Sequence, residues 1–123
     1  MVKPKSAESE LISKIIFGIE NVKGLDVNIM DLTNITNTVC GYFIVCTGTS
    51  NTHVTAIVSS IRKHVSKELK EKPFSIEGNE NQEWVLIDYV DVVVHVFQRE
   101  IREYYDIENL WGDAKITNVE LNA

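Results

Sequence analysis

The sequence predicts an α/β (α+β) protein in which a mixed five-stranded sheet is packed with helices. The spacing of apolar residues switches repeatedly between the helical and the strand period, giving the order helix, strand, strand, helix, strand, strand, strand, helix. A strand–helix–strand unit favours a parallel strand pair, and two strands joined by a tight turn form an antiparallel hairpin. We therefore expect both kinds of pairing in one sheet.

The first helix is predicted to begin after a short tail. Ser6 is a suitable N-cap and Gly24 a suitable C-cap. Its apolar stripe recurs at helical spacing and consists of Leu11, Ile12, Ile15, Ile16, Ile19 and Val22. From Leu25 apolar and polar residues alternate through Ile29, which is typical of a half-buried strand.

The next strand and helix form the centre of the predicted core. The run Tyr42–Cys46 is continuously apolar, as in a strand buried on both faces. Ser50 is the expected N-cap of a long helix that Pro73 ends. The buried stripe of that helix is Val54, Ile57, Val58, Ile61, Val65 and Leu69. Cys40 and Cys46 lack CxxC spacing, so we expect reduced core thiols.

Three further strands and a helix complete the prediction. The strands are expected at Phe74–Glu77, Trp84–Ile87 and Val92–Phe97, and a short turn joins the last two as an antiparallel hairpin. The helical period then returns at Gln98 and continues to Trp111.

The length of 123 residues fits one domain over residues 1–123, with flexible ends at 1–5 and 113–123. No element is assigned to the alternating residues Ile116, Val119 and Leu121. The N-terminus lacks a signal-peptide pattern, and no apolar run approaches the length of a membrane span. Together with the reduced thiols, these features predict a cytoplasmic protein that does not contact membranes.

The charge distribution is uneven. The net charge is −6, and no Lys or Arg stands between Lys72 and Arg99. The acids in that stretch are Glu77, Glu80, Glu83, Asp88 and Asp91. Such a field repels phosphate backbones and attracts a basic protein, so we expect little or no direct nucleic-acid contact. The alternative is that these acids only keep the protein soluble.

One enzymatic hypothesis can be tested on the residues. A nucleotidyltransferase needs a Gly-Ser turn for phosphates and two nearby carboxylates that bind magnesium. Gly48 and Ser50 supply the turn, but the next strand offers Glu77 alone. Asp88 and Asp91 lie further on, at a spacing that does not put both on one strand face. We therefore predict no catalytic, cofactor-binding or metal-binding residues, and no enzyme.

His95 and the tryptophans remain as candidate functional residues. His95 has no Cys or second His at metal-ligand spacing, so a hydrogen-bonded core histidine is the simpler interpretation. Trp84 and Trp111 could fill a core or anchor an interface. Trp84 stands beside the acidic stretch, which suits the interface of a basic protein partner.

Three segments resemble, in order and spacing, the hallmark blocks of the Iojap family, the bacterial ribosomal silencing factors. They read YFIVCTGTSNTHV, EWVLIDYVDVVVHVF and REYYDIENLW. The resemblance runs from Leu11 to Trp111, and the tail from Gly112 lies outside it. It implies a fold similar to a minimal nucleotidyltransferase without the catalytic carboxylate pair.

The resemblance also implies a function. Family members bind the large ribosomal subunit through its fourteenth protein, on the intersubunit face, and sterically prevent the small subunit from joining. Translation is thereby repressed under nutrient limitation or in stationary phase. Organelle relatives help to assemble the large subunit, so an assembly factor is the alternative. The family can also form homodimers.

By this resemblance, the partner-binding surface lies on the strand and turn of residues 84–91, supported by three residues further along the chain. The expected set is Trp84, Leu86, Asp88, Tyr89, Asp91, His95, Arg102 and Tyr105. Two positions depart from the family pattern: Gly41 stands where Asp is common, and Val90 where Gly is common. Because a left-handed conformation is costly for a β-branched residue, we expect a turn of different shape here.

Overall fold

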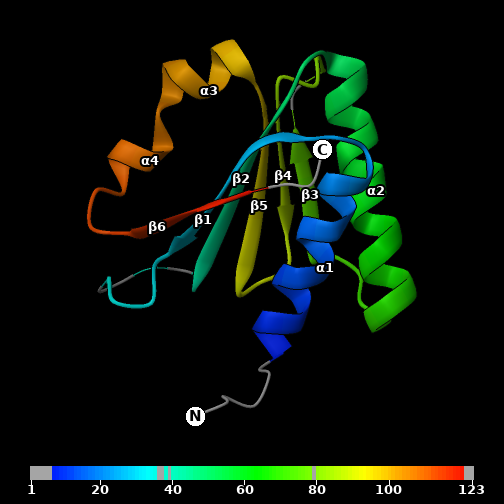
Figure 1. Cartoon of the computed structure of the whole chain (residues 1–123), viewed down its shortest axis with the longest axis horizontal. Coiled ribbons are helices and arrows are strands. Elements are labelled where there is room, and N and C mark those ends of the chain that lie inside the picture. Colours follow the sequence, from blue (N-terminus) through cyan, green and yellow to red (C-terminus); the bar gives the residue numbers. More distant parts are fainter. Residues whose placement is uncertain (1–6, 36–37, 39, 79, 121–123) are drawn as a thin grey trace.

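The computed structural model describes residues 7–35, 38, 40–78 and 80–120, and it shows a mixed sheet with helices on both faces (Figure 1). The elements in chain order are α1 (Ala7–Asn21), β1 (Leu25–Asp31), β2 (Tyr42–Gly48), α2 (Asn51–Leu69), β3 (Ser75–Gly78), β4 (Trp84–Asp88), β5 (Val92–Gln98), α3 (Arg99–Tyr105), α4 (Ile107–Leu110) and β6 (Lys115–Val119). The strands are ordered β3-β4-β5-β2-β1-β6 across the sheet. The predicted mixed sheet is confirmed.

The centre of the sheet is a parallel pair of strands, β2 and β5. Val45 lies opposite His95, and both strands are buried on both faces over most of their length. The predicted parallel pair therefore exists, but it joins β2 to β5. The strand that directly follows α2 is β3, which lies at the sheet edge and pairs only with β4 among the described strands. The antiparallel hairpin of β4 and β5 is as predicted.

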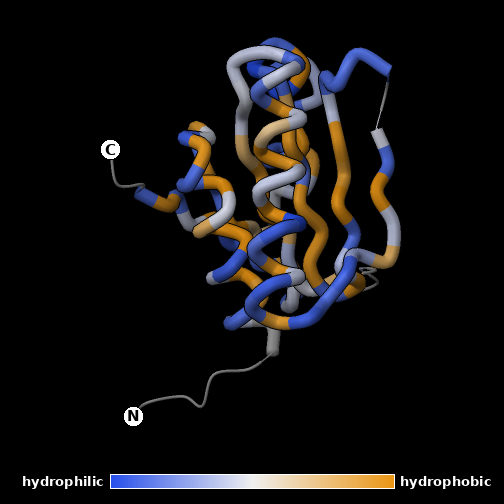
Figure 2. Tube along the Cα trace, turned by 90° about the vertical axis from the view of Figure 1, so that its right-hand side faces the viewer, coloured by the Kyte–Doolittle hydropathy of each residue, from blue (hydrophilic) through white to orange (hydrophobic). Residues whose placement is uncertain are grey.

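Helices α1 and α2 cover the first face of the sheet, and the apolar tube segments of the strands lie directly behind them (Figure 2). The inward-facing side chains of these helices include Ile15 and Ile19 of α1 and Ile57 and Ile61 of α2, which are fully buried. The predicted N-cap of α2 is confirmed, since the Ser50 hydroxyl accepts a hydrogen bond from the His53 N–H at 3.1 Å.

The second face is covered by the shorter helices α3 and α4, over a smaller core that includes Phe43, Phe97 and Ile107. A single helix from Gln98 to Trp111 was expected, but it is broken at Asp106, whose φ is 47°. The break is stabilised locally, because the Asn109 amide donates to the Asp106 carboxylate at 2.6 Å. It turns the chain so that Ile107 enters the core.

The sheet has six described strands, one more than predicted. β6 pairs antiparallel with β1, with Met30 opposite Ile116 and Val27 opposite Val119. The segment 113–123 was expected to be a flexible end, yet residues 115–119 form this edge strand. Most of its residues are exposed on both faces of this edge strand, so the strand needs few apolar residues. The alternation of apolar and polar residues is therefore too weak to predict it.

The end of α1 also differs from the prediction. Lys23, with φ 60°, takes the left-handed position, and Gly24 follows it with its N–H bonded to the Ile19 carbonyl at 2.9 Å. This is a Schellman-type end in which Gly24 is the second residue beyond the cap. A Cβ on Gly24 would lie 2.4 Å from the Ile19 side chain, which explains the glycine. The predicted N-cap Ser6 lies outside the described residues.

Two further expectations concern the thiols and membranes. Cys40 and Cys46 are both buried and free, as predicted. Burial raises the pKa of the Cys46 thiol to about 12, although the charge of Arg102 acts in the opposite direction. Among the described residues, no helix is long and apolar enough to cross a membrane.

The two large helices approach each other closely at Gly18. A Cβ at this position would lie 2.9 Å from the Ile61 Cα, and the Ser60 hydroxyl donates to the Gly18 carbonyl at 2.7 Å. The absence of a side chain thus sets the distance between α1 and α2.

We predict that Gly18→Ala destabilises the protein although alanine favours helices. The gain in helix propensity is about 1 kcal/mol, whereas overpacking a tight contact costs roughly 1–3 kcal/mol. The free energy of unfolding, measured by denaturant titration, should fall by about 1 kcal/mol. Ser13→Ala, at an exposed position of α1, is the matched control and should leave stability unchanged or slightly higher. Equal stability of Gly18→Ala and wild type would show that the helices are not in this close contact.

Candidate protein interface

The candidate interface is the part of the second sheet face that α3 and α4 leave partly open. Along β4, Val85 and Ile87 are buried under α2, while the alternate residues Trp84, Leu86 and Asp88 lie half-buried on the second face. The period-two alternation of a strand produces this division. Trp84 and Leu86 therefore form a row of partly accessible side chains along β4, here called the β4 row, and Asp88 borders it at the end of the strand.

An aromatic cluster supports this row. The Trp84 indole Nε1–H donates to His95 Nδ1 at 3.1 Å, and the Trp84 ring stacks on Phe97 with centroids 4.8 Å apart. Tyr105 reaches Trp84 from α3 with a centroid distance of 4.7 Å, and Phe43 meets the His95 ring edge-on at 4.5 Å. These contacts hold the Trp84 ring in one orientation.

His95 is the floor of the cluster. It is 5% exposed, and desolvation lowers its pKa from 6.5 to about 4. The imidazole is therefore neutral at physiological pH, and because Nδ1 accepts from Trp84, Nε2 carries the proton. Among the described residues no group bonds to Nε2. The predicted core histidine with a hydrogen-bonded neighbour is confirmed.

Acidic and apolar side chains border the row. Glu77 on β3 lies directly opposite Leu86, and Asp88 lies at the end of β4. At that end a hollow of about 280 Å³ is bordered by Phe74 and Val90, which are 79% and 58% exposed. At the other end stands Tyr104, which is 80% exposed. The interface thus combines exposed apolar groups with two carboxylates and has no cation in its row.

The turn after β4 holds Val90 in the left-handed conformation, with φ 77°. The Asp91 N–H donates to the Tyr89 carbonyl at 3.0 Å, which closes a γ-turn around Val90. The Asp88 carboxylate accepts from the Val90 N–H at 2.7 Å. A left-handed conformation was expected to be costly for valine at this position, and the structure nevertheless holds Val90 in it. Hydrogen bonds at Asp88 and Asp91 outweigh the steric cost.

Several residues expected at the interface do gather there, and others do not. Trp84, Leu86 and Asp88 share the face, with Tyr105 beside them and His95 beneath. Asp91 is exposed in the adjoining turn, where its carbonyl accepts from the N–H groups of residues 41 and 42. Tyr89 is separate.

Tyr89 points to the opposite face of the sheet, because it continues the alternation of Val85 and Ile87. It is 6% exposed and lies in the core beneath α2. Burial raises the pKa of its phenol to about 12, while the charges of Arg62 and Glu71 act on it in opposite directions. Its placement on the partner-binding surface is corrected: in this structure it fills the core.

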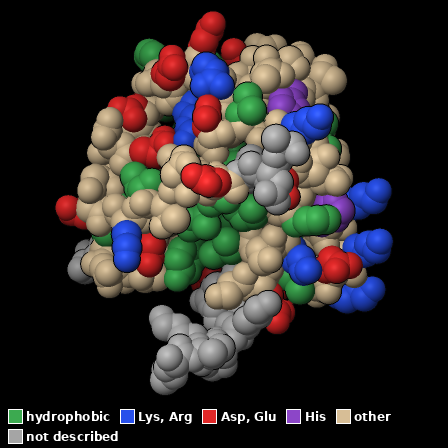
Figure 3. Space-filling model, in the orientation of Figure 1, with side chains coloured by type: hydrophobic (Ala, Val, Ile, Leu, Met, Phe, Trp, Pro, Cys, Tyr) green, Lys and Arg blue, Asp and Glu red, His purple; other side chains and the backbone are tan. Residues whose placement is uncertain are grey.

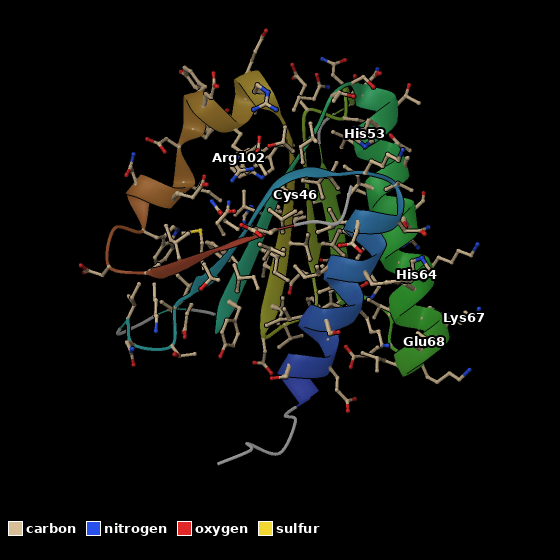
Figure 4. All side chains as sticks on the ribbon, viewed as in Figure 1. Cys46, His53, His64, Lys67, Glu68 and Arg102 are labelled. Carbon is tan, nitrogen blue, oxygen red and sulfur yellow. The ribbon has the colours of Figure 1, made fainter. Side chains whose placement is uncertain are left out.

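Arg102 binds within the protein, which fits the expected supporting role and not a direct contact with the partner. Its guanidinium donates to the Glu108 carboxylate at 2.7 Å, to the Thr47 hydroxyl at 2.9 Å and to the Asp26 carbonyl. Asn28 donates to the same Glu108 carboxylate at 2.9 Å. In Figure 4 Arg102 lies between α3 and the ends of the strands. It ties α3 and α4 to β1 and β2, and so holds Tyr105 in place indirectly.

The electrostatics of this network are favourable. Burial raises the pKa of Glu108, but the hydrogen bonds from Arg102 and Asn28 and the Arg102 charge lower it more, so that the net direction is downward. The Arg102 and Glu108 side chains are 12% and 20% exposed. Removing one partner of such a pair leaves a poorly solvated charge, which is why the pair acts as one structural unit.

Ser50, which was considered as part of a phosphate-binding turn, has a structural role. Ser50 caps α2, and the Thr49 N–H donates to His53 Nδ1 at 2.9 Å. Within the described ranges, no group of three or more His, Cys, Asp or Glu side chains could hold a metal ion.

Sequence reasoning missed three exposed members of this surface, Phe74, Glu77 and Tyr104. Tyr104 stands beside Tyr105 in the segment REYYD, so the doubled aromatic was an available signal. Glu77 becomes a neighbour of Leu86 only through strand pairing, and Phe74 reaches the same face only after β3 has docked. Glu77 was noted as part of the acidic stretch, but its position beside Leu86 had no local signal, and neither had that of Phe74.

Comparisons with known proteins agree with one another. A family model described as "Ribosomal silencing factor during starvation" matches residues 4–123, so the tail that was left outside the resemblance is part of the match. A ribosomal silencing factor of Chromobacterium violaceum is 43% identical over 112 residues, covering 88% of each chain. A crystal structure of a protein from that organism has a TM-score of 0.78 at 39% identity, covering 90% of this chain and 91% of that one. A mouse protein named for mitochondrial assembly of the ribosomal large subunit is 37% identical over 73 residues, covering 57% of this chain and 32% of its own length.

We predict that Val90→Gly stabilises the protein. Relieving a left-handed β-branched residue returns roughly 1–3 kcal/mol, and glycine loses about 0.5–1 kcal/mol through its freer unfolded state. The free energy of unfolding should therefore rise by about 1 kcal/mol. Asp91→Gly, one residue further along the same turn without a left-handed φ, should lower stability. A destabilised Val90→Gly would show that the turn is not strained.

The stability of the protein should depend on pH through His95. Between pH 6.5 and about 4, the unfolded chain binds a proton at His95 that the folded protein excludes, so stability falls as the pH decreases through this range. The loss from this group amounts to about 3 kcal/mol. In His95→Leu the difference in unfolding free energy between pH 7 and pH 4 should be smaller than in wild type by up to that amount. Parallel pH profiles for the two proteins would contradict the buried neutral imidazole.

Proposed function

Since this chain belongs to the family of ribosomal silencing factors, we propose that it binds the large ribosomal subunit through the fourteenth large-subunit protein. Bound there, it occupies the intersubunit face and sterically prevents the small subunit from joining. Translation is thereby repressed when nutrients are limiting or in stationary phase.

The observation that supports this proposal is the half-open row of Trp84 and Leu86, with Tyr105 beside it and Glu77 and Asp88 at its border. Aromatic anchors that become desolvated supply most of the affinity in protein interfaces. Ribosomal proteins are mostly basic, so the carboxylates favour encounter with such a partner and exclude acidic ones.

The rigidity of the row suits inhibition by blocking. Blocking requires a partner that dissociates slowly, and it requires no chemical step. The Trp84 ring is already held by His95 and Phe97, so little side-chain entropy is lost on binding. The aromatic cluster therefore contributes to affinity without itself being fully exposed.

A second role is favoured by one comparison, the similarity to the mouse protein named for assembly of the mitochondrial large subunit. The same contact made on an immature subunit would serve assembly, and made on a mature subunit it would silence translation.

The expected homodimer also stays a prediction, since an apolar surface that binds a partner can pair with a second copy.

We predict that Leu86→Arg abolishes silencing. The change places a cation in the centre of the row, against a basic partner, and removes the apolar contact of Leu86. Loss of a central contact costs about 2 kcal/mol or more of binding free energy, which is over tenfold in affinity. Purified subunits are mixed with the protein at a magnesium concentration that lets them join, and are sedimented through sucrose. Wild type should travel with the large subunit and reduce the joined-ribosome peak, and Leu86→Arg should do neither.

Ile116→Arg is the matched control, because Ile116 is 43% exposed on β6 at the far edge of the sheet, and it should behave as wild type. Folded Leu86→Arg that still binds would place the interface elsewhere. Wild type that binds mature large subunits but leaves the joined peak unchanged would favour the assembly role. Wild type that stays at the top of the gradient would overturn the proposal.

A further inference from the structure

The second half of α2 and the segment that follows it carry a concentration of positive charge in an otherwise acidic protein. Residues 62–72 hold five of the twelve Lys and Arg residues, although the net charge is −6. They are Arg62, Lys63, Lys67, Lys70 and Lys72, and all five are exposed. Lys and Arg side chains line the edge of the molecule over the lower part of α2 (Figure 3), where the labelled Lys67 points away from the sheet (Figure 4).

Internal interactions do not account for this charge. In the part of the chain that the structure describes, none of the five cations forms an ion pair, and Glu68 is paired with Lys14 at 3.7 Å. The helix dipole favours Lys67 in the last turn, but it acts only within that turn and does not reach Arg62 or Lys63. Cations spaced four residues apart, such as Lys63 and Lys67, repel each other slightly. Within the described part of the chain, Arg62 and Lys63 therefore carry charge that neither an ion pair nor the helix dipole compensates.

Beside these cations the surface is hollowed between α2 and β3. The hollow has a volume of about 560 Å³, and it is lined by three basic residues, three serines and one glutamate. These residues are Arg62, Lys63, Lys72, Ser59, Ser66, Ser75 and Glu71. Guanidinium, ammonium and hydroxyl groups are the donors that bind phosphate oxygens, and Arg can do so in bidentate fashion. The wall keeps a net positive charge despite Glu71.

This surface lies on the other side of the sheet from the candidate protein interface. α2 packs on the face to which Val85 and Ile87 point, whereas Trp84 and Leu86 point to the opposite face. The two surfaces also have opposite charge. A ligand of α2 must therefore be anionic, and it can bind while the β4 row is occupied.

We propose that the exposed cations of residues 62–72, together with the hollow between α2 and β3, bind the phosphodiester backbone of ribosomal RNA in the large subunit. This inference rests on the proposed function. The cations on the helix extend over roughly 10 Å, which matches about three successive phosphates of one strand. The donors are charged or hydroxylic, so recognition is of the backbone and independent of base sequence.

The inference departs from the expectation of little nucleic-acid contact, which was drawn from the acidic stretch after Lys72. That stretch contains β3, β4 and the turn after β4, and the cations precede it, on α2 and in the segment between α2 and β3. Glu77 and Asp88 border the β4 row on the second face, whereas the cations lie beside α2 on the first face, so the repulsion predicted from these acids acts at the other surface. The β4 row keeps its expected preference for protein.

The test uses Lys63→Gln/Lys67→Gln, with Lys23→Gln/Lys115→Gln as a control of equal charge change at exposed positions outside residues 62–72. Binding to purified large subunits is titrated at several KCl concentrations. Each phosphate contact contributes roughly 0.7–0.9 to the slope of log K against log salt. The α2 variant should bind about tenfold or more weakly at low salt, with a slope shallower by roughly 1–2, and the control should parallel wild type.

A second titration uses protein-free large-subunit RNA as the probe. Wild type and Leu86→Arg should both bind it, and the α2 variant should bind it more weakly. Equal affinities and slopes of wild type and the α2 variant would overturn the inference. It would also be overturned if the α2 variant lost subunit binding while wild type failed to bind the RNA, because the ligand of α2 would then be an acidic protein. Wild type that binds the RNA through α2 but ignores intact subunits would support the RNA site while overturning the proposed function.

Discussion

The parallel pair of β2 and β5 is the constraint on which the rest of the structure depends. Both strands are apolar on both faces, so each face must be covered for the pair to be stable. On the first face the long helices α1 and α2 cover the central strands, brought together at Gly18. On the second face the described residues form only the short helices α3 and α4, which do not cover the sheet out to β4.

This uneven cover creates the candidate interface. Where α3 ends, the side chains of β4 remain half-buried, and the aromatic cluster under Trp84 closes the core without hiding the row. The position of the boundary depends on Arg102, which fixes α3 and α4 to the neighbouring strands through Glu108 and Thr47. A member of the silencing factor family can thus present a rigid binding surface using side chains that its own core already holds.

Many features of the fold and part of the site were predictable from local patterns. Continuous apolar runs identified the central strands, and Ser50 marked the start of α2, because caps and periodicity are properties of neighbouring residues. Trp84 and Leu86 alternate with Val85 and Ile87, so the sequence already separated the two faces of β4. It did not indicate β6, whose residues are mostly exposed, or the break at Asp106, where side-chain hydrogen bonds override helix periodicity.

The sequence by itself therefore determined most of the element types, the family and many of the residues able to line an interface. The tertiary structure decided which of them do. It placed Tyr89 in the core, turned Arg102 inward to Glu108, and brought Glu77 beside Leu86. It also separated an acidic, aromatic surface on β4 from a basic one on α2. The physical reason is that strand pairing and helix docking join residues distant in the chain, and no local pattern records those contacts.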